Sequence, residues 1–128
     1  MPTAIRFFDK SGTPAVKIGI SGVIQQQPAG FDALIDTGFS AFVSLPLVAA
    51  FPLGLVLFGE TRVVLADGST AYRFTAQGTV WLGAERQSGV IILETGSTEV
   101  LLGMDFLRIF RKRLIVSHNQ GVVLEDDV

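Results

Sequence analysis

ALIDTGFS, residues 33–40, places an aspartate at the end of an apolar run and a glycine two positions later. A carboxylate in that position is held in a tight turn, where backbone N–H groups and the hydroxyl of Thr37 can reach it. Gly38 is needed if the backbone takes a positive φ, or if another chain or a ligand approaches closely. The alternative is an ordinary Asx-type turn at the end of a strand. The tripeptide 36–38 alone does not decide between these two interpretations.

The remaining sequence consists mostly of short runs in which apolar and polar residues alternate, a pattern typical of β-strands. In the run 15–23, Val16, Ile18 and Ile20 share one face, and Lys17 lies on the other. Further strands are predicted within 31–38, 62–74, 79–83, 89–96 and 113–125. Only the segment 103–114 shows helical spacing of its apolar residues. The pattern predicts a mostly-β protein with one short C-terminal helix.

The segment 62–74 carries the clearest turn signal. Asp67-Gly68 lies between two alternating apolar runs, and this dipeptide is the strongest short-range signal for a β-hairpin. At the other end of the chain, the His-Asn-Gln-Gly sequence at 118–121 predicts a second hairpin. We therefore expect two exposed hairpins on one core.

Length and composition exclude several classes of protein. The chain has 128 residues and no cysteine, which predicts a single domain over 1–128 without disulfides or thiolate chemistry. A net charge of -2 gives no attraction for nucleic acid or anionic membranes. The single histidine, His118, cannot form a histidine metal cluster by itself. We expect a cytoplasmic protein without cofactor, nucleic-acid partner or membrane partner.

Two segments bear on membrane targeting. Residues 1–10 lack the basic and apolar regions of a secretory signal. The longest apolar run, 45–59, is shorter than the roughly 20 residues that cross a bilayer, and prolines and glycines interrupt it. This run is predicted to form a buried wall or an interface.

A second stretch, VLLGMDFL at 100–107, supplies the context that the Asp-Thr-Gly tripeptide lacks. The pair ALIDTG and LLGMDFL resembles the retroviral-type (retropepsin-like) aspartic proteases, and most of all the small bacterial clan AA aspartic proteases. In that family a strand with two apolar residues and a glycine braces the Asp-Thr-Gly loop and leads into a short helix. A hairpin flap lies between the two motifs, as 63–72 does here. The resemblance covers 15–116 and implies a closed β-barrel or sandwich with a flap.

The resemblance also implies an activity, which is that of an aspartic endopeptidase acting on extended, largely apolar peptide segments. Two close carboxylates that share one proton supply both the base and the acid for this hydrolysis. One motif per chain is half of such a site, so the resemblance implies a homodimer with one Asp36 from each chain. Thr37 would then hydrogen-bond across the twofold axis, and Gly38 would offer its backbone to the peptide.

The same resemblance assigns residues that bind substrate. The residues 66–69 would form the flap tip, and Leu101 and Leu102 would wall the site, with Gly103 packed behind the loop. The implied substrate-binding residues are Phe39, Ala66, Asp67, Gly68, Ser69 and Leu101.

The chain departs from the retroviral pattern directly after the tripeptide. Phe39 stands where the retroviral enzymes usually have alanine, and Ser40 and Ala41 replace acids. A second hypothesis is therefore a catalytically silent peptide-binding or dimerisation module on the same fold. Asp105, the other acid near a motif, is predicted to cap the helix and not to act in catalysis.

Overall fold

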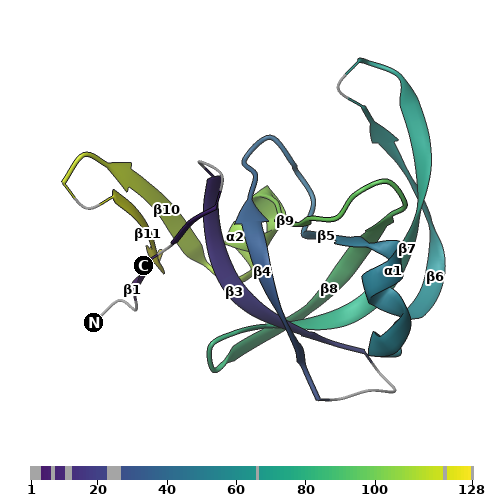
Figure 1. Cartoon of the computed structure of the whole chain (residues 1–128), viewed down its shortest axis with the longest axis horizontal. Coiled ribbons are helices and arrows are strands. Elements are labelled where there is room, and N and C mark those ends of the chain that lie inside the picture. The colour runs from purple at the N-terminus through teal and green to yellow at the C-terminus, as the bar shows by residue number, and fades with distance from the viewer. Residues whose placement is uncertain are drawn as a thin grey trace.

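The computed structural model describes residues 4–6, 8–10, 13–22, 27–65, 67–119 and 121–127. Most of this part of the chain forms β-strands, and the longest of them are β3, β6, β7 and β8 (Figure 1). The strands are β1 (Ala4–Arg6), β2 (Phe8–Lys10), β3 (Thr13–Ser21), β4 (Ala29–Ile35), β5 (Val43–Pro46), β6 (Val56–Val64), β7 (Thr70–Leu82), β8 (Glu85–Glu94), β9 (Val100–Leu102), β10 (Lys112–Ser117) and β11 (Gly121–Asp126). The helical elements are α1 (Leu47–Ala50), the 3-10 helix η1 (Phe51–Leu53) and α2 (Met104–Ile109).

The centre of the molecule is a closed barrel of six strands in the order β3-β4-β9-β5-β8-β7. Pairing between β3 and β7 closes it, at Gly19 to Trp81 and the two pairs that follow. The barrel is mixed, because β4 pairs with β9 and β5 with β8 in parallel. Alternating side chains from these strands fill the interior and are inaccessible to solvent, among them Ile20, Val43, Leu45, Val80 and Leu102. The predicted mostly-β fold with a closed barrel is confirmed.

The strand β7 belongs to two parts of the fold. Its second half is a barrel strand, while its first half pairs with β6 in a hairpin that extends beyond the barrel (Figure 1). The sequence indicated that the second arm of the 62–74 hairpin and the segment 79–83 are separate strands, but β7 (Thr70–Leu82) joins them without a break. One continuous strand therefore connects the predicted flap to the core.

The C-terminal helix is confirmed but is shorter than its apolar spacing suggested. It ends at Ile109, and β10 begins at Lys112 after Arg111, whose φ is 55°. Phe106 and Phe110 pack on each other and on Phe42, which fixes α2 against the loop before β5. The predicted capping role of Asp105 was wrong: the N-cap residue is Gly103, and the Asp105 carboxylate accepts a hydrogen bond from Arg108 at 2.9 Å.

The apolar run 45–59 contains the additional short helices α1 and η1. Leu45 and Leu53 are buried in the core as predicted, whereas Val48 is 78% exposed and Phe51 is 75% exposed. Only part of the run is therefore a buried wall. In the part of the chain that the structure describes, no helix has the length and apolarity required to span a bilayer.

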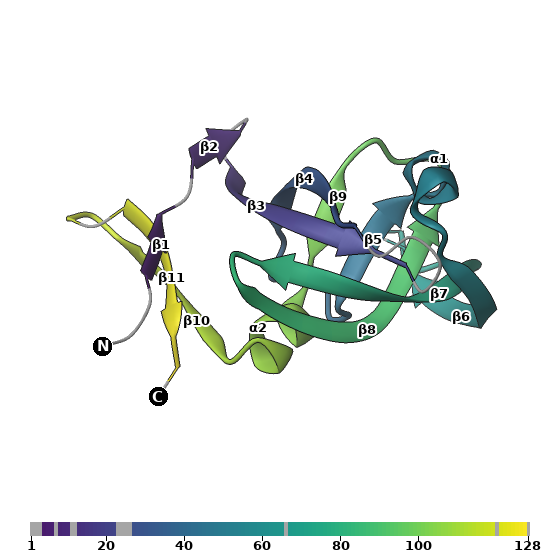
Figure 2. The same cartoon turned by 90° about the horizontal axis from the view of Figure 1, so that it is seen from below.

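A small sheet in the order β1-β11-β10 lies beside the barrel (Figure 2). It contains the predicted second hairpin, in which Ser117 pairs with Gly121. Lys112 anchors it, since its side chain is only 1% exposed and its ammonium donates to Glu85 at 2.7 Å and to Asp126. Burial lowers the pKa of Lys112, but the hydrogen bonds and charges of Asp126 and Glu85 outweigh burial and raise it. Lys112 stands in the basic run Arg111-Lys112-Arg113, and no local pattern in the sequence predicts that the lysine of such a run is buried.

Candidate active site

The Asp36 loop begins directly after β4 and is held by its own backbone. Asp36 N–H donates to the Leu102 carbonyl at 3.0 Å, which ties the loop to β9. Gly38 N–H donates to Asp36 Oδ1 at 2.9 Å, and Phe39 N–H donates to the Asp36 carbonyl at 3.1 Å. The loop is therefore an Asx turn, and it still presents the carboxylate, Thr37 and Gly38 to solvent. The loop is thus an ordinary Asx turn and also a turn that holds an exposed carboxylate, so the two interpretations of the Asp-Thr-Gly motif do not exclude each other.

The second motif braces this loop from behind. In the parallel pair β4–β9, Leu34 lies opposite Leu101 and Ile35 opposite Leu102. Gly103 N–H then donates to the Phe42 carbonyl at 3.0 Å, and Met104 N–H donates to the Phe39 carbonyl at 2.8 Å. The loop from Asp36 to Phe42 is thus hydrogen-bonded at both ends to the segment 102–104.

Gly103 is the point of closest approach. A Cβ at this residue would lie 2.1 Å from the Ala41 carbonyl oxygen and 2.5 Å from the Phe39 carbonyl oxygen, distances that a methyl group cannot occupy. The Phe39 ring also reaches into this space, with Cδ2 at 2.7 Å from the same point. Phe39 is accommodated here because residue 103 has no side chain.

A cleft of about 500 Å³ lies between the loop and the hairpin. One wall is the loop 38–41, the other is the segment 61–65 of the hairpin, and Ile92 and Glu94 of β8 complete it. Leu101 is half-buried and is not among the lining residues, while Leu102 is wholly buried in the core. Phe39 is the implied substrate-binding residue that lines this cleft.

The hairpin tip has the hydrogen bonds of a tight turn. Leu65 N–H donates to the Ser69 carbonyl at 2.8 Å, and Gly68 N–H donates to the Leu65 carbonyl at 2.9 Å, with Gly68 at φ 86°. The loop is therefore one residue longer than the two-residue turn that Asp67-Gly68 suggested. Asp67, Gly68 and Ser69 are exposed at this tip, and Ala66 lies outside the described residues.

Asp67 stabilises the tip through its side chain. Its carboxylate accepts hydrogen bonds from the hydroxyl of Ser69 at 2.5 Å and from the Ser69 N–H at 2.9 Å. These two bonds, the hydroxyl first, lower the pKa of Asp67. The carboxylate of Asp67 is therefore stabilised in its charged form by hydrogen bonds to Ser69 within the turn.

With the endopeptidase activity that the sequence resemblance implies, we expect Gly68→Val to impair peptide cleavage more than folding. A β-branched residue resists the positive φ of residue 68, although no atom lies within 4 Å to clash with it. Gly83→Val is the matched control, because Gly83 has φ 61° in the β7–β8 turn and equally open surroundings. The free energy of unfolding should fall by a similar amount in both variants, about 1–2 kcal/mol. Peptide cleavage should fall only in Gly68→Val, and equal losses of cleavage would show that the hairpin is merely structural.

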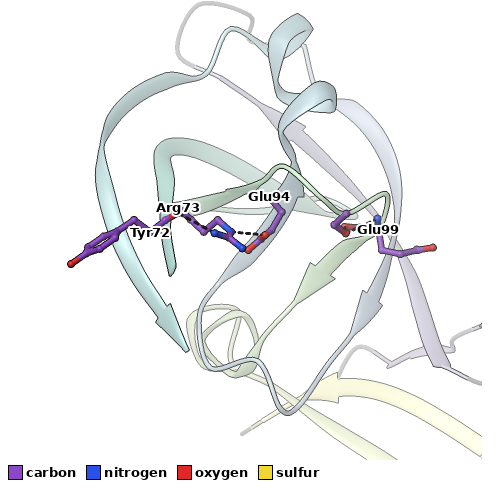
Figure 3. Close-up of polar contacts among 5 residues, drawn as sticks. Tyr72, Arg73, Glu94 and Glu99 are labelled. Carbon is purple, nitrogen blue, oxygen red and sulfur yellow. Dashed lines mark hydrogen bonds and ion pairs between the residues drawn. The ribbon is translucent and has the colours of Figure 1, made fainter. Parts of the chain in front are cut away.

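An ion pair between two strands borders the cleft (Figure 3). Arg73 Nε donates to Glu94 Oε2 at 2.7 Å, and Arg73 Nη1 donates to the Tyr72 carbonyl at 3.1 Å. The side chains of Arg73 and Glu94 are 21% and 24% exposed. Sequence analysis missed this pair, since the residues are 21 positions apart and only the register of β7 and β8 brings them together.

A second hollow, of about 580 Å³, lies on the other side of the Asp36 loop. Thr37 lines it together with Met104 and Leu107 of α2 and residues 111–114. Among the hydrogen bonds of the described residues, none involves the Thr37 hydroxyl. This side chain is therefore available to a partner outside the chain.

The fold of this chain superposes on those of two known aspartic proteases. A retropepsin-like aspartic protease from Rickettsia conorii superposes with a TM-score of 0.68 at 16% identity, over 98% of this chain and 93% of that one. The EIAV protease in complex with the inhibitor HBY-793 superposes with a TM-score of 0.62 at 16% identity, over 85% of this chain and 98% of that one. No family model and no curated protein matches the sequence. The chain has the retropepsin-like fold, and its resemblance to these enzymes is one of structure.

Proposed function

We propose that the protein is an aspartic endopeptidase whose active site forms when two copies pair, each contributing one Asp36. One observation carries the proposal: an exposed carboxylate sits in a loop that its own backbone and the neighbouring parallel strand β9 hold in place, and the next residues of that loop form one wall of a cleft whose other wall is the hairpin. An extended peptide fits such a cleft. Six of the eleven residues that line the cleft are apolar, which suits a peptide segment with apolar side chains.

The chemistry follows from two carboxylates in close contact. They cannot both be ionised, so they hold one proton between them. The ionised Asp36 takes a proton from water, which attacks the peptide carbonyl, while the protonated Asp36 of the other chain donates to the carbonyl oxygen. Thr37 supports this pairing, because it is exposed, follows Asp36 directly in the chain and lines the hollow beside α2.

The substrate side of the site comprises Gly38 and Phe39 in the loop and the hairpin tip above them. In this proposal Gly38 binds the peptide backbone, Phe39 contacts its side chains in the cleft, and residues 66–69 reach the peptide when the tip closes. The exposed hairpin tip closes over the peptide and excludes water. Residues 1–128 act as one domain, and the protein works in the cytoplasm, a location that the absence of cysteine favours.

Cleavage of a diverse peptide mixture, read by mass spectrometry, tests the proposal. Purified wild-type protein should cut internal bonds, and Asp36→Asn should cut none of them. Cleavage that persists in Asp36→Asn would refute the mechanism. If neither protein cleaves but both bind peptide, the protein is the silent binding module that was the second hypothesis.

A further inference from the structure

Resting on the proposed peptide-binding cleft, we propose that Glu94 makes the site select substrates with a basic side chain. The carboxylate of Glu94 would receive the ammonium or guanidinium group of one lysine or arginine within an otherwise apolar peptide. Glu94 is the only acidic residue among the described residues that line the cleft. This preference for a basic side chain would come from β8, which belongs neither to the Asp36 loop nor to the hairpin tip.

The register of three strands places Glu94 on the cleft side of the sheet. Side chains alternate between the two faces of a strand, and directly opposed residues share a face. Thr61 lies opposite Arg73, and Ile92 lies opposite Thr75, which stands two residues after Arg73 on β7. Glu94 stands two residues after Ile92 on β8 and is bonded to Arg73. Thr61, Ile92 and Glu94 therefore share the face that lines the cleft.

Glu94 keeps acceptor capacity in this position. Oε2 accepts the Arg73 Nε–H, and no bond to Oε1 occurs among the hydrogen bonds of the described residues. The side chain is 24% exposed, so a ligand can reach the carboxylate although protein shields most of it. Arg73 also donates to the Tyr72 carbonyl, which together with the ion pair fixes the direction of the carboxylate (Figure 3). A fixed acceptor in a partly desolvated cleft strengthens a charged hydrogen bond.

The surroundings favour a basic side chain over an acidic one. Val63 and Ile92 line the cleft beside Glu94 and can pack against the methylene stem of a lysine or arginine. Arg62 also lines the cleft, but it follows Thr61 in the strand, so its side chain leaves from the opposite face, next to Tyr72. Because Arg73 neutralises Glu94, the selection acts at contact distance and not through a long-range field.

Binding to an inactive background tests the inference without turnover. In Asp36→Asn chains, fluorescence anisotropy is measured with labelled peptides from one extended apolar series, in which a lysine, a glutamine or a glutamate is moved through each position. At one position the lysine peptide should bind about tenfold or more tightly than the glutamine peptide. Adding Glu94→Gln should remove this preference and leave the affinity of the glutamine peptide within about twofold.

Two further variants separate recognition from structure. Glu60→Gln is the matched control, since Glu60 lies opposite the exposed Phe74 on the outer face of the hairpin and should leave the lysine preference intact. The double variant Arg73→Glu with Glu94→Arg keeps an ion pair but reverses its direction, so the preferred peptide should change from lysine to glutamate. A merely structural pair would give no such reversal.

The outcomes for this inference and for the proposed function are distinct. Equal affinity for lysine and glutamine peptides at every position would overturn the role of Glu94, whether or not the wild-type protein cleaves peptides. A lysine preference that survives Glu94→Gln would do the same. Loss of the preference in Glu94→Gln, combined with absence of cleavage in the wild-type protein, would support the inference and refute the endopeptidase.

Discussion

An equal mixture of wild-type and Asp36→Asn chains, refolded together, is expected to cleave peptide at about one quarter of the rate of the same total of wild-type chain. Random pairing through a twofold interface gives roughly one quarter wild-type dimers, one half mixed dimers and one quarter mutant dimers. Asparagine keeps the shape of aspartate but cannot exchange the proton, so a mixed dimer loses the acid–base pair. Its rate should fall by about 10²–10⁴-fold.

Two measurements complete this experiment. Sedimentation of each preparation should show the same dimer, because the substitution keeps the size and shape of the exposed side chain. A preparation in which the two chains are refolded separately and then mixed without exchange should keep half of the wild-type activity. Activity strictly proportional to the wild-type chain after refolding together would mean that each subunit works alone, and the proposed two-chain site would be wrong.

Gly103→Ala is expected to be the most damaging single-methyl change in the loop region, with a loss of about 3 kcal/mol or more in the free energy of unfolding. The added Cβ would lie 2.1 Å from the Ala41 carbonyl oxygen, and the second contact, at 2.5 Å, is also a backbone oxygen. Neither atom can rotate away, so the Asp36 loop must leave β9. Urea unfolding and peptide cleavage should therefore both reveal the damage, as a lower midpoint and a lower rate.

The control for this prediction is Gly30→Ala, on the same strand that leads into Asp36. Gly30 is exposed, and an added methyl group there would meet no atom within 4 Å, so stability should change by less than about 0.5 kcal/mol. A second variant identifies the source of strain. Adding Phe39→Ala to Gly103→Ala removes the ring but not the two carbonyl oxygens, so it should not restore stability. Full recovery in the double variant would show that the ring, and not the backbone, demands a glycine.

The sequence by itself determined the elements whose signals are local. Strand alternation in 15–23 identified the buried face of β3, with Val16, Ile18 and Ile20 in the core and Lys17 outside. The Asp67-Gly68 pair located the β6–β7 hairpin, because a tight turn needs a residue that tolerates positive φ. The two motifs around Asp36 and Gly103 indicated the fold together, since a loop and its brace must both be present for the carboxylate to be held.

The tertiary structure decided everything that depends on distant residues lying side by side. Lys112 lies in a run of three basic residues, 111–113, yet its side chain is buried because the fold brings it to Glu85 at the start of β8 and to Asp126 at the end of β11. The helix α2 ends early because Arg111 turns the chain into β10, although its apolar spacing continues to Leu114. Glu94 reaches the cleft only through the register of β8 on β7. No local pattern encodes these contacts, because each depends on which strands pair when the barrel closes.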